Sequence, residues 1–245
     1  MIAVQNLKRM LGDRAAHREQ ARIALAMLAV TALYEAASAY VLGPDFALNW
    51  YEVIGTWSGL TCVWLSRTRN ILCWPWGIVS AAALGAFFAQ IGLPGQQWLN
   101  WGYFLVIQLW AWPNWVFGGA GRTELPVSRL SFLGRAAVLL SVAAGTVAVY
   151  VTIGLIAPGS LYPIVDALVV ASSVVAQFLL GRKIVESWVL WLGPVNAASI
   201  FLFAAAGAYT VMALYVAFFI HALVALRSWN TVFRSGARIG APITI

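Results

Sequence analysis

Polar side chains at helical spacing are the first candidates for ligand chemistry in this sequence. Asp166, Ser173 and Gln177 are separated by seven and four residues, so they share one face of a helix. Apart from Ser172, the residues around them, from 163 to 181, are apolar. A carboxylate, a hydroxyl and an amide on such a helix offer hydrogen bonds to a small polar molecule.

A second group of polar and aromatic residues follows in the stretch KIVESWVLWLGPVN, residues 183–196. It carries Trp188, Trp191 and Asn196 over a wide helical face, with Asn196 near the middle of its apolar run. A Gly-Pro pair lies between Trp191 and Asn196, and a proline inside a helix removes a backbone hydrogen bond and bends the helix. We expect the bend to open space for a ligand beside these two side chains.

A third group forms a polar stripe in the first half of the chain, with Asn100, Tyr103, Gln108 and Asn114. Gln108 lies near the middle of its apolar run. Four residues near the ends of apolar runs are candidate gate residues: Glu52, Trp74, Glu186 and Asp166, which also belongs to the first group. The two cysteines and two histidines cannot supply an ordinary zinc site, so we expect no metal and no cofactor.

The composition indicates where these side chains must act. Of the 245 residues, 62% are hydrophobic and only 9% are charged, which lies far outside the range of soluble domains. The chain is therefore predicted to be an all-α integral membrane protein, because unpaired backbone groups cannot face lipid. Single amides in membrane helices also join helices, contributing about 0.6 to 2 kcal/mol, so each amide has a structural alternative.

Apolar runs long enough to cross a membrane predict eight spans. They are 23–43, 51–66, 71–91, 97–117, 133–157, 163–181, 184–207 and 208–228. In this arrangement every lysine and arginine lies on one side of the membrane. By the positive-inside rule that side is the cytoplasm, and both termini lie there. The net charge of +7 is thus explained by topology, and nucleic-acid binding is not expected.

The sequence also predicts an internal repeat. A shift of 114 residues aligns Glu52 with Asp166 and Trp74 with Trp188 without gaps. Corresponding helices are four spans apart, so the repeats must be parallel. The predicted segments are a basic N-terminal segment, an extra N-terminal helix, repeat 1, a loop with a linker helix, repeat 2 and a tail: 1–22, 23–43, 50–117, 118–157, 162–229 and 230–245.

These features resemble the PnuC family of vitamin transporters, whose members carry nicotinamide riboside. The matching stretches are RNILCWPWGIVS at 69–80, YPIVDALVVASSVVAQFLLGRKIVESWVLWLGPVN at 162–196 and YTVMALYVAFFIHALVALRSW at 209–229. In the second stretch the family's acidic, amide and aromatic residues recur at Asp166, Gln177, Glu186, Trp188, Trp191 and Asn196. Asn196 departs from the aspartate of some relatives.

The resemblance implies a three-plus-one-plus-three arrangement, similar to the SWEET sugar transporters, in a bacterial inner membrane. It implies facilitated uptake, followed by trapping when a cytosolic kinase phosphorylates the riboside. An indole face attracts a pyridinium ring by about 0.5 to 2 kcal/mol, and amides match the ligand's carboxamide and hydroxyls. The predicted substrate-binding residues are Trp188, Trp191, Asn196, Gln177, Ser173, Gln108, Asn100 and Tyr103.

Three alternatives stay open at this point. A proton-coupled transporter of a related vitamin could use Glu52 or Asp166. A membrane-embedded hydrolase could use Ser58 and His221, although no orienting acid is evident and helix packing is the favoured role of His221. A ligand-free scaffold would pair every midplane amide with a neighbouring helix. The oligomeric state is not predicted, and a homo-oligomer is one option.

Overall fold

The computed structural model describes residues 12–43, 47–90, 97–156, 162–205 and 209–238. Most of these residues form helices, and the β-structure among them is an isolated parallel bridge between Ser128 and Ile184. The chain divides into two compact units, Met1–Leu125 and Pro126–Ile245. Five helical stretches of the described residues are long and apolar enough to cross a membrane: Arg14–Val41, Phe132–Leu155, Pro163–Gly181, Glu186–Ala205 and Leu214–Gly236. The chain is thus an all-helical protein with several candidate membrane spans.

The first unit contains four long helical elements and one π-helical turn. They are α2 (Arg14–Leu42), α3 (Trp50–Arg67), α4 (Cys73–Gln90), η2 (Leu99–Phe104, π) and α6 (Leu105–Phe117). Asp13 caps the start of α2 by accepting from the backbone nitrogen of Ala15 at 2.8 Å. Asn49 caps α3 in the same way, accepting from Tyr51 at 3.0 Å.

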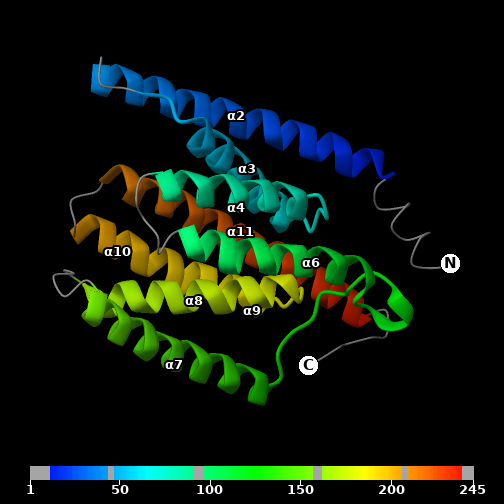
Figure 1. Ribbon diagram of the computed structural model, residues 1–245. Coiled ribbons are helices and arrows are strands. Elements are labelled where there is room, and N and C mark those ends of the chain that lie inside the picture. Colours follow the sequence, from blue (N-terminus) through cyan, green and yellow to red (C-terminus); the bar gives the residue numbers. More distant parts are fainter. Residues whose placement is uncertain (1–11, 44–46, 91–96, 157–161, 206–208, 239–245) are drawn as a thin grey trace. The chain divides into compact units, whose positions relative to one another are not determined.

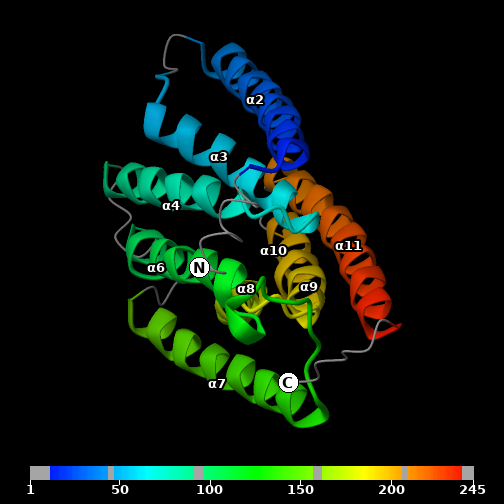
Figure 2. The same ribbon diagram turned by 90° about the vertical axis from the view of Figure 1, so that its right-hand side faces the viewer.

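Small residues bring α3 and α4 close together within this unit, where the two helices run side by side in Figures 1 and 2. The Ser80 hydroxyl donates to the Gly55 carbonyl at 2.7 Å. A Cβ on Gly59 would lie only 2.7 Å from that hydroxyl oxygen, so a larger residue there would displace the Ser80 side chain. Close backbone approach through small residues is the usual way in which membrane helices associate.

The second unit begins with α7 (Phe132–Ile156), which packs along α8 (Pro163–Gly181), as Figure 1 shows. One continuous helical stretch follows, composed of α9 (Glu186–Leu190), the π-helical η4 (Trp191–Ala197) and α10 (Ala198–Ala205). The last helix is α11 (Tyr209–Arg238). Because η4 packs against both α8 and α11, it lies in the interior of this unit.

The predicted bend at Gly193-Pro194 takes the form of a π-helical segment. Pro194 has no backbone N–H, so the regular hydrogen-bond ladder cannot continue through it, and the wider π turn accommodates the gap. π-Helical turns inside α-helices occur frequently at functional sites. The local distortion therefore falls on the stretch where the sequence predicts a ligand.

The observed helices extend beyond two of the predicted spans. The helix predicted to begin at 23 begins at Arg14, and the helix predicted to end at 228 continues to Arg238. Both extensions consist largely of polar residues. A helix can continue through such residues because its backbone hydrogen bonds form whether or not the side chains are apolar. The outer loops IGLPGQQ and APGSLY and the break near 207 lie largely or wholly outside the described residues.

Candidate substrate-binding site

Two buried amides in the second unit are the best-placed candidates for binding a substrate. Asn196 on η4 is 4% exposed and Gln177 on α8 is 9% exposed, and their two elements pack against each other. Within the described residues neither side chain makes a hydrogen bond to protein. Because a buried amide normally has a partner, these two groups are available to hydrogen-bond a ligand.

The two tryptophans that were predicted to contact the ligand differ in their surroundings. Trp191 is half-buried at the start of η4 and packs against the apolar cluster formed by α7, α8 and the α9 region. Trp188 is 3% exposed, and its ring lies edge-on to His221 at 5.9 Å and to Trp229 at 5.7 Å. In this conformation Trp191 has free surface to offer, whereas Trp188 is enclosed by protein.

Ser173 and Asp166 share α8 with Gln177. The Ser173 hydroxyl donates to the Val169 carbonyl at 2.8 Å, which satisfies it within its own helix. Asp166 is half-buried in the first turn of α8, where the helix dipole favours a negative charge. On the predicted shared face the Ser173 hydroxyl is therefore hydrogen-bonded within its own helix. The other two groups, Asp166 and Gln177, lie at different depths along α8.

In the first unit Gln108 joins helices. Its Nε2 donates to the Gly77 carbonyl at 3.0 Å, and its Oε1 lies 3.9 Å from the Cys62 sulfur. A Cβ on Gly77 would come within 1.4 Å of that oxygen, so the glycine makes room for the amide. Gln108 therefore connects α6 to α3 and α4 in this conformation. Asn100 is buried on η2, and Tyr103, also on η2, packs against Phe104 with ring centroids 5.4 Å apart.

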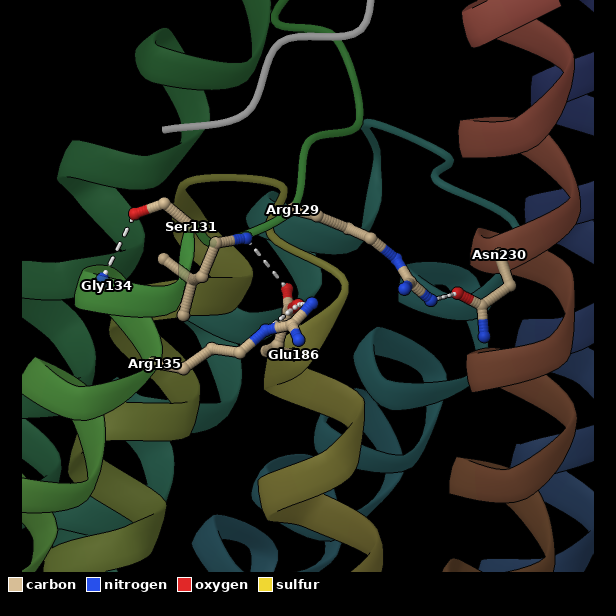
Figure 3. Close-up of polar contacts among 7 residues, drawn as sticks. Arg129, Ser131, Gly134, Arg135, Glu186 and Asn230 are labelled. Carbon is tan, nitrogen blue, oxygen red and sulfur yellow. Dashed lines mark hydrogen bonds and ion pairs between the residues drawn. The ribbon is translucent and has the colours of Figure 1, made fainter.

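The candidate gate residues have distinct environments. Glu52 is half-buried in the first turn of α3, and Trp74 is buried edge-on against Trp115 at 5.0 Å. Glu186, at the start of α9, forms an ion pair with Arg135 at 3.1 Å and also accepts from the backbone nitrogen of Leu130 at 3.2 Å (Figure 3). Whether any of these residues acts as a gate stays a prediction.

The residues of the hydrolase alternative have structural roles. The Ser58 hydroxyl donates to the carbonyls of Ile54 and Gly55 in its own helix. His221 is 4% exposed and its ring packs against Trp188, consistent with the favoured helix-packing role. No group of three or more metal-ligating residues is found in the part of the chain that the structure describes.

Equivalent turns in the two units have the same hydrogen bonds. The nitrogen of Asn70 donates to the Leu65 carbonyl at 3.2 Å, and the nitrogen of Ile184, 114 residues later, donates to the Leu179 carbonyl at 3.0 Å. The preceding residues, Arg69 and Lys183, both have a left-handed backbone, with φ of 63° and 53°.

Burial lowers the pKa of Arg69, and the carboxylates of Glu124 and Glu19 oppose that shift.

Sequence reasoning missed a polar cluster at the start of the second unit. Arg129 donates to the Asn230 side chain on α11 and lies over the Phe233 ring at 5.5 Å, while Arg135 pairs with Glu186 (Figure 3). The arginines were assigned only to membrane topology. Their spacing of six residues around a span boundary gave no signal that they meet side chains more than 50 positions away.

Known proteins resemble most of this chain. The family model described as nicotinamide mononucleotide transporter matches residues 49–231. The nicotinamide riboside transporter PnuC of Escherichia coli is 27% identical over 222 residues, covering 79% of this chain and 90% of that protein. The riboflavin/roseoflavin transporter RibM of Streptomyces davaonensis is 28% identical over 152 residues, covering 60% of this chain and 70% of that protein. A crystal structure of the vitamin B3 transporter PnuC shares the fold, with a TM-score of 0.63 and 23% identity over 88% of this chain and 92% of that one.

Proposed function

Because the chain belongs to the nicotinamide mononucleotide transporter family, we propose that it carries nicotinamide riboside across a bacterial cytoplasmic membrane. Family membership makes the protein a membrane transporter of a vitamin and not an enzyme. The substrate is the one named for its relatives from Escherichia coli and Neisseria mucosa. Transport is by facilitated diffusion, and a separate cytosolic kinase traps the riboside by phosphorylation.

The observation that carries the proposal is the pair of buried amides, Asn196 and Gln177, which have no protein hydrogen bond among the described residues. Nicotinamide riboside has a carboxamide and ribose hydroxyls, which match the donors and acceptors of two amides. Trp191 is half-buried near them and supplies a ring face for the cationic pyridinium, an attraction of about 0.5 to 2 kcal/mol. We assign Asn196 and Gln177 to the polar groups and Trp191 to the ring.

The remaining predicted binding residues are ranked by what they already contact. Trp188 and Ser173 support the site, since Trp188 is enclosed and the hydroxyl of Ser173 is satisfied within α8. Gln108 is structural in this conformation because it donates to Gly77. Asn100 and Tyr103 stay predictions as ligand contacts.

We further propose eight spans in a three-plus-one-plus-three arrangement with an extra N-terminal helix and both termini in the cytoplasm. The matching turns support the duplication, as do two tryptophan pairs 114 residues apart. Trp74 packs edge-on against Trp115, and Trp188 packs edge-on against Trp229. The π-helical η4 is the element best suited to change shape during alternating access, because its backbone ladder is already interrupted.

Binding and transport are tested separately. Purified protein is titrated with nicotinamide riboside while tryptophan fluorescence is followed, and a saturable change is expected because Trp191 lies at the site. No fluorescence change and no heat of binding at millimolar ligand would contradict the proposal and favour a scaffold. In proteoliposomes, labelled riboside should reach equal concentrations inside and outside without an imposed pH gradient. Accumulation of unmodified riboside driven by an imposed pH gradient would instead show proton coupling.

A second vitamin is favoured by a specific observation. The riboflavin/roseoflavin transporter RibM is as similar in identity, at 28%, as the nicotinamide riboside transporters. Riboflavin is uncharged and larger, so it would gain less from a cation–π contact with Trp191. Uptake of labelled riboflavin into proteoliposomes decides between them: saturable riboflavin uptake that nicotinamide riboside inhibits would assign the flavin as a substrate.

A further inference from the structure

A strap of residues 126–131 crosses one end of the second unit and fixes the arginines there. The backbone nitrogen of Ser128 donates to the Lys183 carbonyl at 3.0 Å, and the nitrogen of Val185 donates to the Ser128 carbonyl at 3.0 Å. The nitrogen of Leu130 donates to Glu186 at 3.2 Å. These three bonds hold the strap against the turn between α8 and α9, so Arg129 is presented from a fixed backbone.

The charges at this end do not balance. Glu186 is paired with Arg135 at 3.1 Å and accepts the Leu130 N–H, so its charge is compensated (Figure 3). Arg129 has only neutral neighbours in the contacts described, the Asn230 amide and the Phe233 ring. Its Nε atom is buried and has no hydrogen-bond partner among the described residues. Among the described residues the Arg129 guanidinium therefore has one donor without a hydrogen bond and forms no ion pair.

A cavity of about 330 Å³ opens beside these arginines. It is lined by Arg129, Arg135, Val185, Glu186, Val189 and Leu226. Besides the two arginines and the Glu186 carboxylate that pairs with Arg135, the lining consists of three aliphatic side chains: Val185 just before α9, Val189 on α9 and Leu226 on α11. This volume is at the lower end of small-molecule sites, large enough for a headgroup but not for a folded peptide.

The surroundings of the cavity are those of a membrane interface. Phe132 and Leu133, at the start of α7, are 84% and 78% exposed, and Val189 on the cavity wall is 49% exposed. Large apolar side chains this exposed face lipid in a membrane protein, while the arginines mark the edge of the apolar zone. The cavity therefore has arginine side chains beside an apolar wall, as expected for a site at the level of the lipid headgroups.

We propose that this cavity binds the phosphate headgroup of an anionic phospholipid. Arginine binds phosphate with two parallel N–H donors, and basic pockets between membrane helices on the cytoplasmic side are suited to anionic headgroups. Arg135 is 53% exposed, so it can turn toward the phosphate while keeping Glu186 as a partner. Val185, Val189 and Leu226 then contact the glycerol and the first acyl carbons, which inorganic phosphate lacks. The inference rests on the proposed membrane placement and not on the proposed substrate.

The effect of the lipid follows from the position of the strap. A bound headgroup would supply the missing counter-charge of Arg129 and hold the strap to α9 and α11 together. We therefore expect anionic lipid to stabilise the second unit without being transported. Neutral phosphatidylcholine, whose phosphate is compensated by its own choline, should do so much less.

The test measures lipid retention and thermal stability of the full chain. Protein in phosphatidylcholine nanodiscs is compared with protein in nanodiscs containing phosphatidylglycerol, and bound lipid is counted by native mass spectrometry. Arg129→Gln and Arg135→Gln should each reduce phosphatidylglycerol retention by about fivefold. Arg234→Gln, which removes an equal charge from an exposed position on α11, serves as the matched control and should retain the lipid.

Independent outcomes keep the proposal refutable if a variant fails to fold. The unmodified protein should show a higher unfolding temperature with phosphatidylglycerol than with phosphatidylcholine, and millimolar inorganic phosphate should neither reproduce nor compete away that increase. Equal retention by all variants, equal stability in both lipids, or full displacement by inorganic phosphate would each overturn the proposal. Riboside binding is measured in parallel, so failure of the lipid site and failure of the proposed function are distinguishable.

Discussion

Replacing Asn196 by leucine should weaken substrate binding without destabilising the protein. Leucine has nearly the same shape as asparagine but cannot hydrogen-bond. Asn196 is 4% exposed and has no hydrogen bond to the described residues, so Asn196→Leu removes no such bond and places an apolar side chain at a buried position. The free energy of unfolding should therefore stay unchanged or increase.

The affinity should change in the opposite direction. If Asn196 hydrogen-bonds the riboside, its loss leaves a buried polar group of the ligand unpaired, at a cost of about 1 to 3 kcal/mol. The dissociation constant should then rise by about 5-fold to 150-fold. The measurement is a tryptophan-fluorescence titration, accompanied by thermal unfolding of the same preparation.

Gln108→Leu is the matched comparison, because it also replaces a buried amide. Gln108 donates to the Gly77 carbonyl at 3.0 Å, so its loss should lower the free energy of unfolding by about 0.6 to 2 kcal/mol. Its effect on affinity should be smaller than that of Asn196→Leu. The reasoning is refuted if Asn196→Leu lowers stability and leaves the dissociation constant unchanged, since Asn196 would then be a structural amide.

Three further predictions follow from particular contacts. Gly77→Ala should lower the free energy of unfolding by about 1 to 3 kcal/mol, because the new Cβ would lie 1.4 Å from Gln108 Oε1. Adding Gln108→Ser should recover part of this loss, as measured by thermal unfolding. If it recovers none, the clash is not the cause. Trp57→Phe removes the hydrogen bond that the Trp57 indole donates to the Ala24 carbonyl at 2.8 Å. Amide hydrogen exchange in α2 should therefore become faster, while exchange in α7 stays unchanged. Glu186→Ala should reduce thermal stability by about 1 kcal/mol, and Glu186→Gln, which still accepts an N–H bond, by less; equal losses would contradict that role of the N–H bond.

The positions of the helices were largely predictable, because apolar runs and their boundaries follow from the chemistry of the bilayer. The helix ends were less so. Arg14, Arg18 and Arg22 were read as a segment before the first span, yet all three lie in α2. A helix can leave the apolar zone and continue through polar residues, and hydropathy gives no signal of where it stops.

Which of the buried amides join helices could not be predicted. Gln108 and Asn196 look alike in sequence, since each is an amide near the middle of an apolar run. The difference depends on a neighbour: Gly77 leaves room for the Gln108 side chain and offers it a carbonyl. Only the packing of α4 against α6 brings that carbonyl within reach, and spacing along one helix does not report it.

The helix bounds favour a wider duplication than the three-helix repeat predicted from the sequence. The last described helical residues of α2 and α7, Leu42 and Ile156, are 114 positions apart, the same offset that separates the end of α3 at Arg67 from the end of α8 at Gly181. Each leading helix also packs against the next helix in its own unit. The sequence comparison depended on polar and aromatic landmarks, and lipid-facing helices such as α7 carry few of them. If α2 is the counterpart of α7, the described residues of each unit contain four corresponding helical stretches, with α2 and α7 leading them.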